Sequence, residues 1–221
     1  MMKKIPVNKY SQYGKFTKRQ KMTNTLRYYG IRDSRILAAF LAMPRHRFVP
    51  PDQEDRAYAD TPLHIGYGQT ISQPYVIAFM LEAMELKPHD NVLEVGSGCG
   101  YVTALLSMLV KKVTGIELEK ALVTRSRLIL KDLEIKNVRI VHGDGYRGFE
   151  PNAPYDGILV SAAPDDVPEH LFQQLKEGGS LIIPVGKYSQ MLKKIKKKEG
   201  QRIETNLLDV RFVPLRKPSI Y

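Results

Sequence analysis

Hydrophobic and polar residues alternate along the 221-residue chain in a pattern that predicts an α/β protein. Longer segments with apolar residues at helical spacing separate short apolar runs of strand length, which predicts a mostly parallel, doubly wound sheet. The strands are expected at residues 92–95, 113–116, 138–141, 154–160 and 181–185. The helices are expected at residues 18–29, 34–43, 75–86, 101–110, 118–133 and 168–175.

The two ends of the chain differ from this alternating middle. Residues 1–15 are polar and basic and predict a loosely ordered arm, whereas residues 191–213 predict a closing β-hairpin. Residues 43–51, bounded by prolines, are expected to be extended, and residues 178–179 to form a turn. We expect one compact domain in three parts: an N-terminal helical cap and loop segment (1–89), a Rossmann-like core (90–186) and a C-terminal hairpin completing the sheet (187–221).

A glycine loop lies at the centre of the pattern. The strand at 92–95 runs into Gly96-Ser97-Gly98-Cys99-Gly100, and the next helix leads to a second strand that ends on Glu117. A parallel βαβ unit places the loop and Glu117 at the carboxyl edge of the sheet, where open α/β sheets bind ligands. Glycines let the backbone pass close to a ligand, and a carboxylate at this place can accept both hydroxyl hydrogens of a ribose. The sequence therefore predicts a nucleoside site rather than a tight turn alone.

The spacing of the glycines selects among nucleoside ligands. Dinucleotide sites use G-x-G-x-x-G, whereas the glycines here fall as G-x-G-x-G and Tyr101 stands at the position of the last one. The pattern E-x-G-x-G-x-G resembles motif I of the S-adenosylmethionine-dependent methyltransferases. Asp144 follows the third strand, where an acid can reach an adenine amino group, although an aspartate between two glycines is also an ordinary turn residue.

A second polar loop, residues 66–74, is dense in hydroxyl and amide groups. Ser72 can cap the helix that Pro74 opens, and the local pattern alone favours this structural role. The functional alternative is that Ser72 and Thr70 face the nucleoside site and donate hydrogen bonds to a substrate oxygen. Nothing around Ser72 resembles the nucleophile elbow of a serine hydrolase.

Composition changes this interpretation mainly through charge. A hydrophobic content of 43% and a charged content of 26% are globular values, and the sequence shows no apolar run of membrane-spanning length, so we expect a cytoplasmic protein with no membrane partner. A lone cysteine, Cys99, excludes an internal disulfide framework and a cysteine metal cluster. The net charge of +11 is concentrated in residues 1–21 and 193–198, without the interleaved aromatic residues of single-strand binders. A solvated surface is therefore favoured over a nucleic-acid site.

Several segments together resemble one methyltransferase family. They are Met43 to Pro50, Gly66 to Pro74, Val92 to Gly100, His142 to Gly145, Ala162 to Pro164, Glu177 to Gly179 and Val210 to Leu215. Through them the chain is similar to the protein-L-isoaspartate O-methyltransferases, from about the first helix to the C-terminus. The glycine loop is shared with all methyltransferases, but the G-Q-T-I-S-Q-P segment at residues 68–74 is specific to this family. Cys99, Tyr146 and Tyr75 depart mildly from the family pattern.

The resemblance implies a Rossmann-like methyltransferase fold, S-adenosyl-L-methionine as co-substrate, no metal, and a set of site residues. Ser72 would be the active-site hydroxyl. The residues that bind the co-substrate would be Gly96, Ser97, Gly98, Glu117, Asp144 and Gly145. Thr70, Gln73 and Tyr75 are further candidates for contacts with the substrate.

The implied reaction is methyl transfer to the free α-carboxylate of L-isoaspartyl residues in aged proteins, which initiates their repair. Such a carboxylate, with an ordinary pKa of ~3.9, is already ionised at neutral pH, so the reaction requires no general base. The partners would be isoaspartyl-containing proteins and peptides, with no specific nucleic acid, and the chain would be a monomer.

Two other classes of protein stay open. An RNA methyltransferase is favoured by the net charge of +11 and disfavoured by residues 161–164, which lack the N/D-P-P-Y/F motif of many amine methyltransferases. A non-catalytic binding module is disfavoured by the intact Ser72, Glu117 and Asp144.

Overall fold

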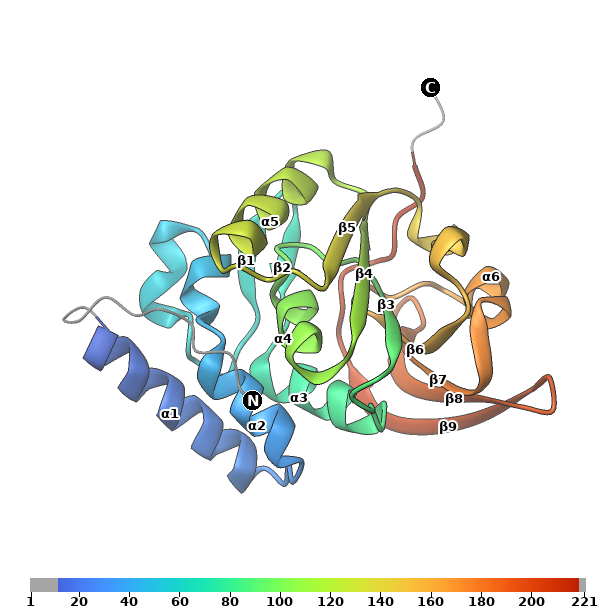
Figure 1. Ribbon diagram of the computed structural model, residues 1–221, viewed down its shortest axis with the longest axis horizontal. Coiled ribbons are helices and arrows are strands. Elements are labelled where there is room, and N and C mark those ends of the chain that lie inside the picture. The colour runs from blue at the N-terminus through green and yellow to red at the C-terminus, as the bar shows by residue number, and fades with distance from the viewer. Residues whose placement is uncertain (1–11, 219–221) are drawn as a thin grey trace.

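A seven-stranded sheet runs through the computed structural model, which describes residues 12–218 (Figure 1). Its strand order is β5-β4-β3-β6-β7-β8-β9. The parallel strands are β3 (Asn91–Val95), β4 (Lys112–Glu117), β5 (Val138–His142), β6 (Tyr155–Val160) and β7 (Leu175–Val185). The antiparallel strands are β8 (Gln190–Lys198) and β9 (Gln201–Val210). The mostly parallel sheet with a C-terminal hairpin is therefore confirmed.

Both faces of the sheet are covered, because side chains that alternate along each strand enter two different cores. On β3, Val92 packs into the larger core, whereas Leu93 and Val95 pack into the smaller one. The larger core is built with α1 (Gln12–Tyr28), α2 (Ser34–Ala42), α3 (Pro74–Ala83), α4 (Tyr101–Leu109) and α5 (Lys120–Asp132). The smaller core contains α6 (Glu169–Gln173). No helix of the described residues is long and apolar enough to cross a membrane.

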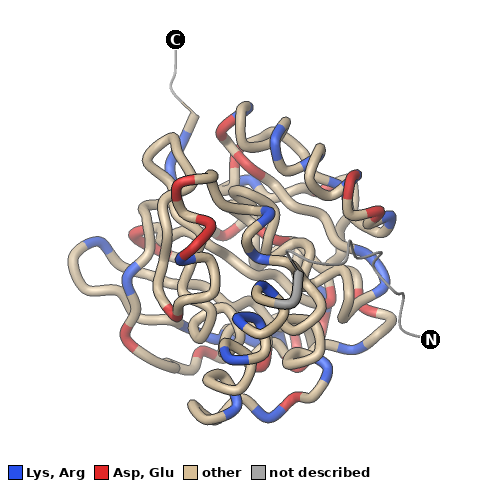
Figure 2. Tube along the Cα trace, turned by 90° about the vertical axis from the view of Figure 1, so that its left-hand side faces the viewer, with Lys and Arg blue, Asp and Glu red and all other residues tan. Residues whose placement is uncertain are grey.

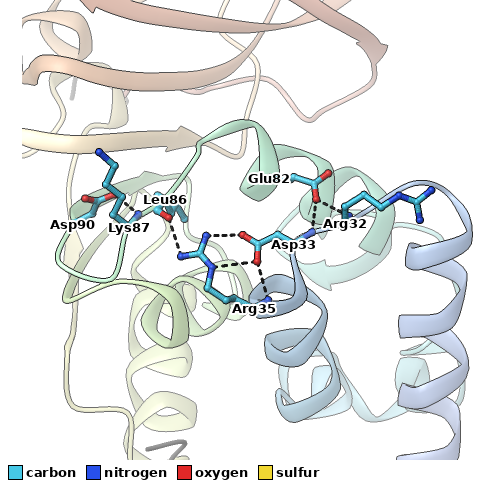
Figure 3. A network of polar contacts seen from close by, with 7 residues as sticks. All are labelled: Arg32, Asp33, Arg35, Glu82, Leu86, Lys87 and Asp90. Carbon is cyan, nitrogen blue, oxygen red and sulfur yellow. Dashed lines mark hydrogen bonds and ion pairs between the residues drawn. The ribbon is translucent and has the colours of Figure 1, made fainter.

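A polar network ties the N-terminal helices to the rest of the fold (Figure 3). Asp33 is the N-cap of α2, and its carboxylate accepts the Arg35 backbone N–H at 2.8 Å. The carboxylate of Glu82, on α3, accepts the backbone N–H groups of Arg32 and Asp33, each at 2.7 Å. Arg35 in turn donates to the Leu86 carbonyl at 3.0 Å, close to the start of β3. The helical layer is thus fixed to the segment that leads into the sheet.

Three local predictions were wrong. Residues 43–51 are not extended, because two short 3₁₀ helices, Arg45–Phe48 and Pro51–Arg56, occupy most of the stretch and its flank. The glycines at 178–179 make no turn but lie within β7, where Gly178 (φ 78°) accompanies an irregular register with β6. The arm expected at residues 1–15 already becomes helix α1 at Gln12, and its residues 1–11 lie outside the described part of the chain.

A short antiparallel hairpin, β1 (Leu63–Gly66) and β2 (Gln69–Ile71), was not predicted. The sequence of residues 52–70 has no strong periodicity, and a two-stranded ribbon of this length is held mainly by what it packs on. Leu63, Ile65 and Ile71 provide that packing, since each is at most 3% exposed in the larger core. The hairpin places the polar segment around Thr70 next to the carboxyl edge of the sheet.

Three lysines of strand β8 pair with two acidic neighbours, and basic and acidic positions lie among one another along the chain in Figure 2. Lys193 pairs with Glu204 at 2.9 Å, and Lys194 and Lys196 both pair with Glu85, at 2.9 and 3.3 Å. The ammonium of Lys197 donates to the Leu175 carbonyl at 2.9 Å and lies 5.2 Å from the Phe172 ring centroid. The residue run at 193–198 is therefore not a free cationic surface.

Candidate active site

A cleft opens at the carboxyl edge of the parallel strands, where β3, β4 and β6 end. Segments far apart in the sequence line it: the β1–β2 hairpin, the glycine loop, the end of β4, the loop after β6 and the C-terminal segment. The lining residues are Gln69, Thr70, Gly96, Gly98, Ile116, Glu117, Leu118, Gly145, Ser161, Ala162, Val213, Pro214, Leu215 and Arg216. Such an edge is where open α/β sheets bind ligands.

The glycine loop is folded over the end of β4 by backbone hydrogen bonds. The N–H groups of Gly96 and Ser97 both donate to the Ile116 carbonyl, at 2.8 and 3.1 Å. Gly96 (φ 76°) and Gly98 (φ 51°) adopt left-handed conformations that disfavour other residues. A Cβ at residue 98 would also lie 3.3 Å from Ile65 of the hairpin. The loop therefore needs glycine for its backbone course, and hydrogen-bond groups of the backbone reach the cleft.

Glu117 holds this loop with both oxygens of its carboxylate. One oxygen accepts the Gly98 N–H at 2.8 Å, and the other accepts the Glu119 N–H at 2.9 Å, just before α5 begins. The side chain is buried yet lines the cleft. A carboxylate oxygen can accept more than one hydrogen bond, so Glu117 can still bind hydroxyl groups of a ligand.

A second carboxyl group, Glu94, lies beneath the cleft and is 1% exposed. The Thr103 hydroxyl donates to one of its oxygens, and the hydroxyl of Ser161, a residue of the cleft lining, lies 3.3 Å from the other. The pKa of Glu94 is raised to about 8, chiefly by burial; the nearby Glu117 adds to the rise and the two hydroxyls oppose it. The carboxyl group is therefore neutral at pH 7 and supports the floor of the site without adding a charge.

The structure brings part of the predicted set together. Thr70, Gly96, Gly98, Glu117 and Gly145 all line the cleft. They come from the hairpin, the glycine loop, the end of β4 and the segment that follows β5, so residues that are distant in the sequence meet at one edge.

Two predicted co-substrate residues, Ser97 and Asp144, do not belong to the cleft lining. Ser97 is 4% exposed and its hydroxyl has no hydrogen-bond partner within residues 12–218. The carboxylate of Asp144 accepts the Tyr146 backbone N–H at 2.9 Å and caps the 3₁₀ helix Gly145–Arg147. This is the ordinary turn role that the sequence left open for Asp144, and it leaves the other carboxylate oxygen without a partner among the described residues.

Ser72 does not cap α3, so the structural role favoured by its local sequence is wrong. Pro74 does open the helix, but its N-cap residue is Gln73 and makes no side-chain cap. The missing acceptor comes from Asp60, whose carboxylate accepts the Tyr75 backbone N–H at 2.8 Å. The Ser72 hydroxyl makes no hydrogen bond to any described residue.

Gln73 and Tyr75 also make contacts within the protein. The Gln73 side-chain amide donates to the other Asp60 oxygen at 2.8 Å. The Tyr75 ring packs edge-on against Tyr29, with 5.4 Å between centroids, and lies 6.2 Å from Phe79. Neither residue belongs to the cleft lining.

The analysis of the sequence missed other lining residues. The small-residue loop at 161–164 was noticed only for the motif that it lacks, yet Ser161 and Ala162 line the cleft. Val213 to Arg216 lie beyond the last strand, and backbone bonds fix them beside that loop: Ala163 N–H donates to the Val213 carbonyl at 2.8 Å and Leu215 N–H to the Ala163 carbonyl at 2.7 Å. The family-like V-R-F-V-P-L segment was the available signal for them.

Fold and site define the class of protein. A mostly parallel sheet with a glycine loop after its first core strand and an acid at the end of the next is the arrangement of the Rossmann-like S-adenosylmethionine-dependent methyltransferases. Within residues 12–218 no three His, Cys, Asp or Glu side chains gather closely enough to hold a metal ion.

The comparisons with known proteins give the family. The sequence profile of the protein-L-isoaspartate(D-aspartate) O-methyltransferases matches residues 17–219. A protein-L-isoaspartate O-methyltransferase of Aliivibrio fischeri (strain ATCC 700601 / ES114) is 48% identical over 190 residues, which are 86% of this chain and 91% of the relative. The chain belongs to this family, and it is an S-adenosylmethionine-dependent enzyme that methylates isoaspartyl residues in proteins.

Solved structures agree. One protein-L-isoaspartate O-methyltransferase superposes with a TM-score of 0.81 at 33% identity, over 89% of this chain and 65% of that one. A Plasmodium falciparum structure assigned to the same activity, in complex with S-adenosyl-L-homocysteine, gives a TM-score of 0.80 at 32% identity, over 90% of this chain and 99% of that one.

Replacing Glu117 by Gln is expected to weaken the binding of S-adenosylhomocysteine. An amide in place of the carboxylate presents an NH₂ group to one of the two backbone N–H donors, so one bond of the loop is lost together with the charge. A charge-assisted hydrogen bond contributes roughly 1.5–3 kcal/mol, which corresponds to an affinity about 10- to 100-fold lower by calorimetry. Glu119→Gln, which changes only the cap of α5, is the control and should bind normally. Unchanged affinity of the Glu117 variant would contradict this role.

Stability is expected to depend on pH through Glu94. Between pH 4.5, its ordinary pKa, and about 8, the unfolded chain has lost the Glu94 proton while the folded chain keeps it. The free energy of unfolding therefore falls as the pH rises through this window, by at most about 1.4 kcal/mol per pH unit from this group. Below the window the carboxyl is protonated in both states and contributes no slope.

Glu94→Gln keeps a neutral side chain of the same shape and removes this titration. Urea unfolding should show the variant gaining stability relative to the unmodified chain between pH 5 and pH 8. Glu150→Gln, at an exposed position of the 3₁₀ helix Glu150–Asn152, is the control and should follow the unmodified chain. Parallel pH profiles for the Glu94 variant and the unmodified chain would show that Glu94 is charged in the fold.

Proposed function

We propose that methyl transfer takes place in this cleft and that the Ser72 hydroxyl binds the accepting carboxylate. The observation that carries the proposal is the meeting of the β1–β2 hairpin with the glycine loop. Thr70 of the hairpin lines the same cleft as Gly96, Gly98 and Glu117. A peptide bound at the hairpin would therefore lie beside the co-substrate.

The burial pattern supports a cleft-facing Ser72. Ile71 is 3% exposed and points into the core, whereas its neighbours Thr70 and Ser72 are both half-buried. Ser72 directly follows β2 and is not itself among the residues that line the cleft. Residues two apart share a face in extended backbone, so Ser72 would face the same way as Thr70 if the course of β2 continues by one residue. Because Asp60 caps α3 in its place, the Ser72 hydroxyl is free to donate.

The chemistry needs orientation more than proton transfer. When bound, S-adenosylmethionine supplies a methyl group on a positively charged sulfur. A new C–O bond forms to the ionised isoaspartyl carboxylate as the S–CH₃ bond breaks, and the two charges cancel. The Ser72 hydroxyl donates a charge-assisted hydrogen bond that aims the carboxylate oxygen, and orientation of this kind can supply much of the rate. No side chain has to act as a general base.

We assign the co-substrate side of the cleft to the glycine loop and the acid that holds it. Backbone groups of Gly96, Gly98 and Gly145 would lie against the nucleoside, and Glu117 would accept the ribose hydroxyls. Ser97 and Asp144 stay predictions: the free hydroxyl of Ser97 and the second oxygen of Asp144 are the groups that could contribute. Thr70 would contact the peptide, with Gln73 and Tyr75 at its flank.

The protein substrates of this activity carry L-isoaspartyl residues, and methylation of their free α-carboxylate would start the repair. We further propose that the chain is cytoplasmic and acts as a monomer. Light scattering on the purified protein would check the monomeric state. The paired lysines of β8 give the RNA methyltransferase alternative no support.

Ser72→Ala is expected to lower kcat for an isoaspartyl peptide while leaving the affinity for S-adenosylhomocysteine unchanged. Loss of one hydrogen bond to a charged group would reduce kcat by about 10- to 100-fold. The matched control is Ser107→Ala, since the Ser107 hydroxyl only bonds the Ala104 carbonyl within α4. A Ser72 variant with the kcat of the unmodified enzyme would remove the hydroxyl from the mechanism.

A further inference from the structure

Arg45 is a fully buried cation without an ion pair. Its side chain is 0% exposed, and no acidic group among the described residues forms a salt bridge with it. Burial lowers the pKa of its guanidinium, and Asp60, Tyr58, Tyr101 and Cys99 oppose that shift only through longer-range attraction. Moving an ionised group from water into the protein interior costs free energy, so a buried charge is expected to make specific contacts within the protein.

Those contacts converge on the residue proposed to bind substrate. One guanidinium nitrogen, Nη2, donates to the Ser72 carbonyl at 2.9 Å and lies 3.4 Å from the Thr61 carbonyl. The remaining donors, Nε and Nη1, have no hydrogen-bond partner within residues 12–218. The guanidinium carbon instead lies 5.1 Å from the centroid of the Tyr101 ring, at a cation–π distance.

Tyr101 connects this contact to the co-substrate side of the cleft. It is the first residue of α4 and directly follows the glycine loop. Its ring is 1% exposed and is packed edge-on by Phe40 and Phe48, at 6.2 and 5.3 Å. Arg45 therefore makes two contacts. One nitrogen of its guanidinium binds the Ser72 carbonyl, and the guanidinium carbon lies over the Tyr101 ring, next to the glycine loop.

Asp60 fixes the same loop from its other end. Its two oxygens hold the Gln73 side chain and the Tyr75 backbone N–H, each at 2.8 Å. The Ser72 carbonyl, the Gln73 side chain and the Tyr75 backbone N–H are thus held by Arg45 and Asp60, which lie outside the loop. The Ser72 hydroxyl itself has no hydrogen-bond partner among the described residues.

We propose that Arg45 is a positioning residue for methyl transfer: its guanidinium fixes the Ser72 carbonyl against the Tyr101 ring and so aims the Ser72 hydroxyl at the substrate carboxylate. The inference rests on the role of Ser72 proposed above. Arginine suits the task because its planar group can donate in one direction while stacking on an aromatic ring in another. Neither contact reaches the cleft lining itself, so the effect on substrate would be indirect.

The test compares Arg45→Met and Arg45→Lys with a matched control. Arg19→Met also removes a guanidinium that donates to a backbone carbonyl, that of Ala42 at 2.9 Å, and lies over an aromatic ring, Phe16 at 5.7 Å, but in the α1–α2 layer. Each variant is measured for Tm, for the Kd of S-adenosylhomocysteine, and for kcat and KM with an isoaspartyl peptide.

Arg45→Met is expected to lower kcat by about 10- to 100-fold with a smaller change in KM, because a misplaced reacting group costs rate. The Kd should stay within about twofold of that of the unmodified enzyme, since no co-substrate contact is removed. Arg45→Lys should have a higher kcat than Arg45→Met, since lysine restores a hydrogen-bond donor but not the planar guanidinium over the Tyr101 ring. Arg19→Met should lower Tm and leave kcat unchanged.

If Arg45→Met does not fold, Arg45→Lys carries the test, with an expected kcat between those of the unmodified enzyme and Ser72→Ala.

The double variant with Ser72→Ala separates this inference from the role of Ser72 itself. If Arg45 acts through Ser72, the Arg45 substitution should cost no further kcat once the hydroxyl is gone. An equal loss of kcat in both backgrounds, or a kcat unchanged by either Arg45 substitution, would overturn the inference while leaving Ser72 in place. A Ser72→Ala enzyme with full kcat would overturn both.

Discussion

The carboxylate of Glu117 is the interaction on which the site depends. It ends β4, and its two oxygens accept the N–H of Gly98 and the N–H of Glu119. The glycine loop, the second parallel strand and the start of α5 are therefore joined through one side chain at the carboxyl edge of the sheet. Glycine at residues 96 and 98 permits the left-handed backbone of this loop, and the Glu117 carboxylate helps to fix the course that glycine permits.

The rest of the molecule builds the cleft around that anchor. The β1–β2 hairpin has little pairing of its own and is held by Leu63, Ile65 and Ile71 in the larger core. Arg45 and Asp60 then fix the chain that leaves the hairpin, on either side of Ser72. On the opposite side of the cleft, the C-terminal segment is bonded to Ala163 after β6. Buried contacts therefore restrain the hairpin and the C-terminal segment as well as the glycine loop.

The sequence predicted the core of this arrangement because its signals are local. Apolar runs, the glycine loop and the acid after the second strand together determine a βαβ unit, and Asp33 as the cap of α2 is a contact between close neighbours. The predictions failed where a distant partner decides the outcome. Asp60 lies fifteen positions before Tyr75, so the pattern around Ser72 could not show that the cap was already provided.

The same reason explains Arg45 and the C-terminal segment. Residues 43–51 look extended from their prolines, yet the 3₁₀ helix at Arg45–Phe48 turns a charged side chain inward to carbonyls 16 and 27 positions away. A buried arginine of this kind leaves no periodic signal. Val213 to Arg216 reach the cleft only because the antiparallel hairpin β8–β9 returns the chain across the sheet.

The most direct test is transfer of labelled methyl from S-adenosylmethionine to a short isoaspartyl peptide, measured beside the same peptide with ordinary aspartate and beside a structured RNA. The account predicts label on the isoaspartyl peptide alone, and its loss in mild alkali as an ester requires. Stable label on RNA, or equal labelling of the two peptides, would contradict it.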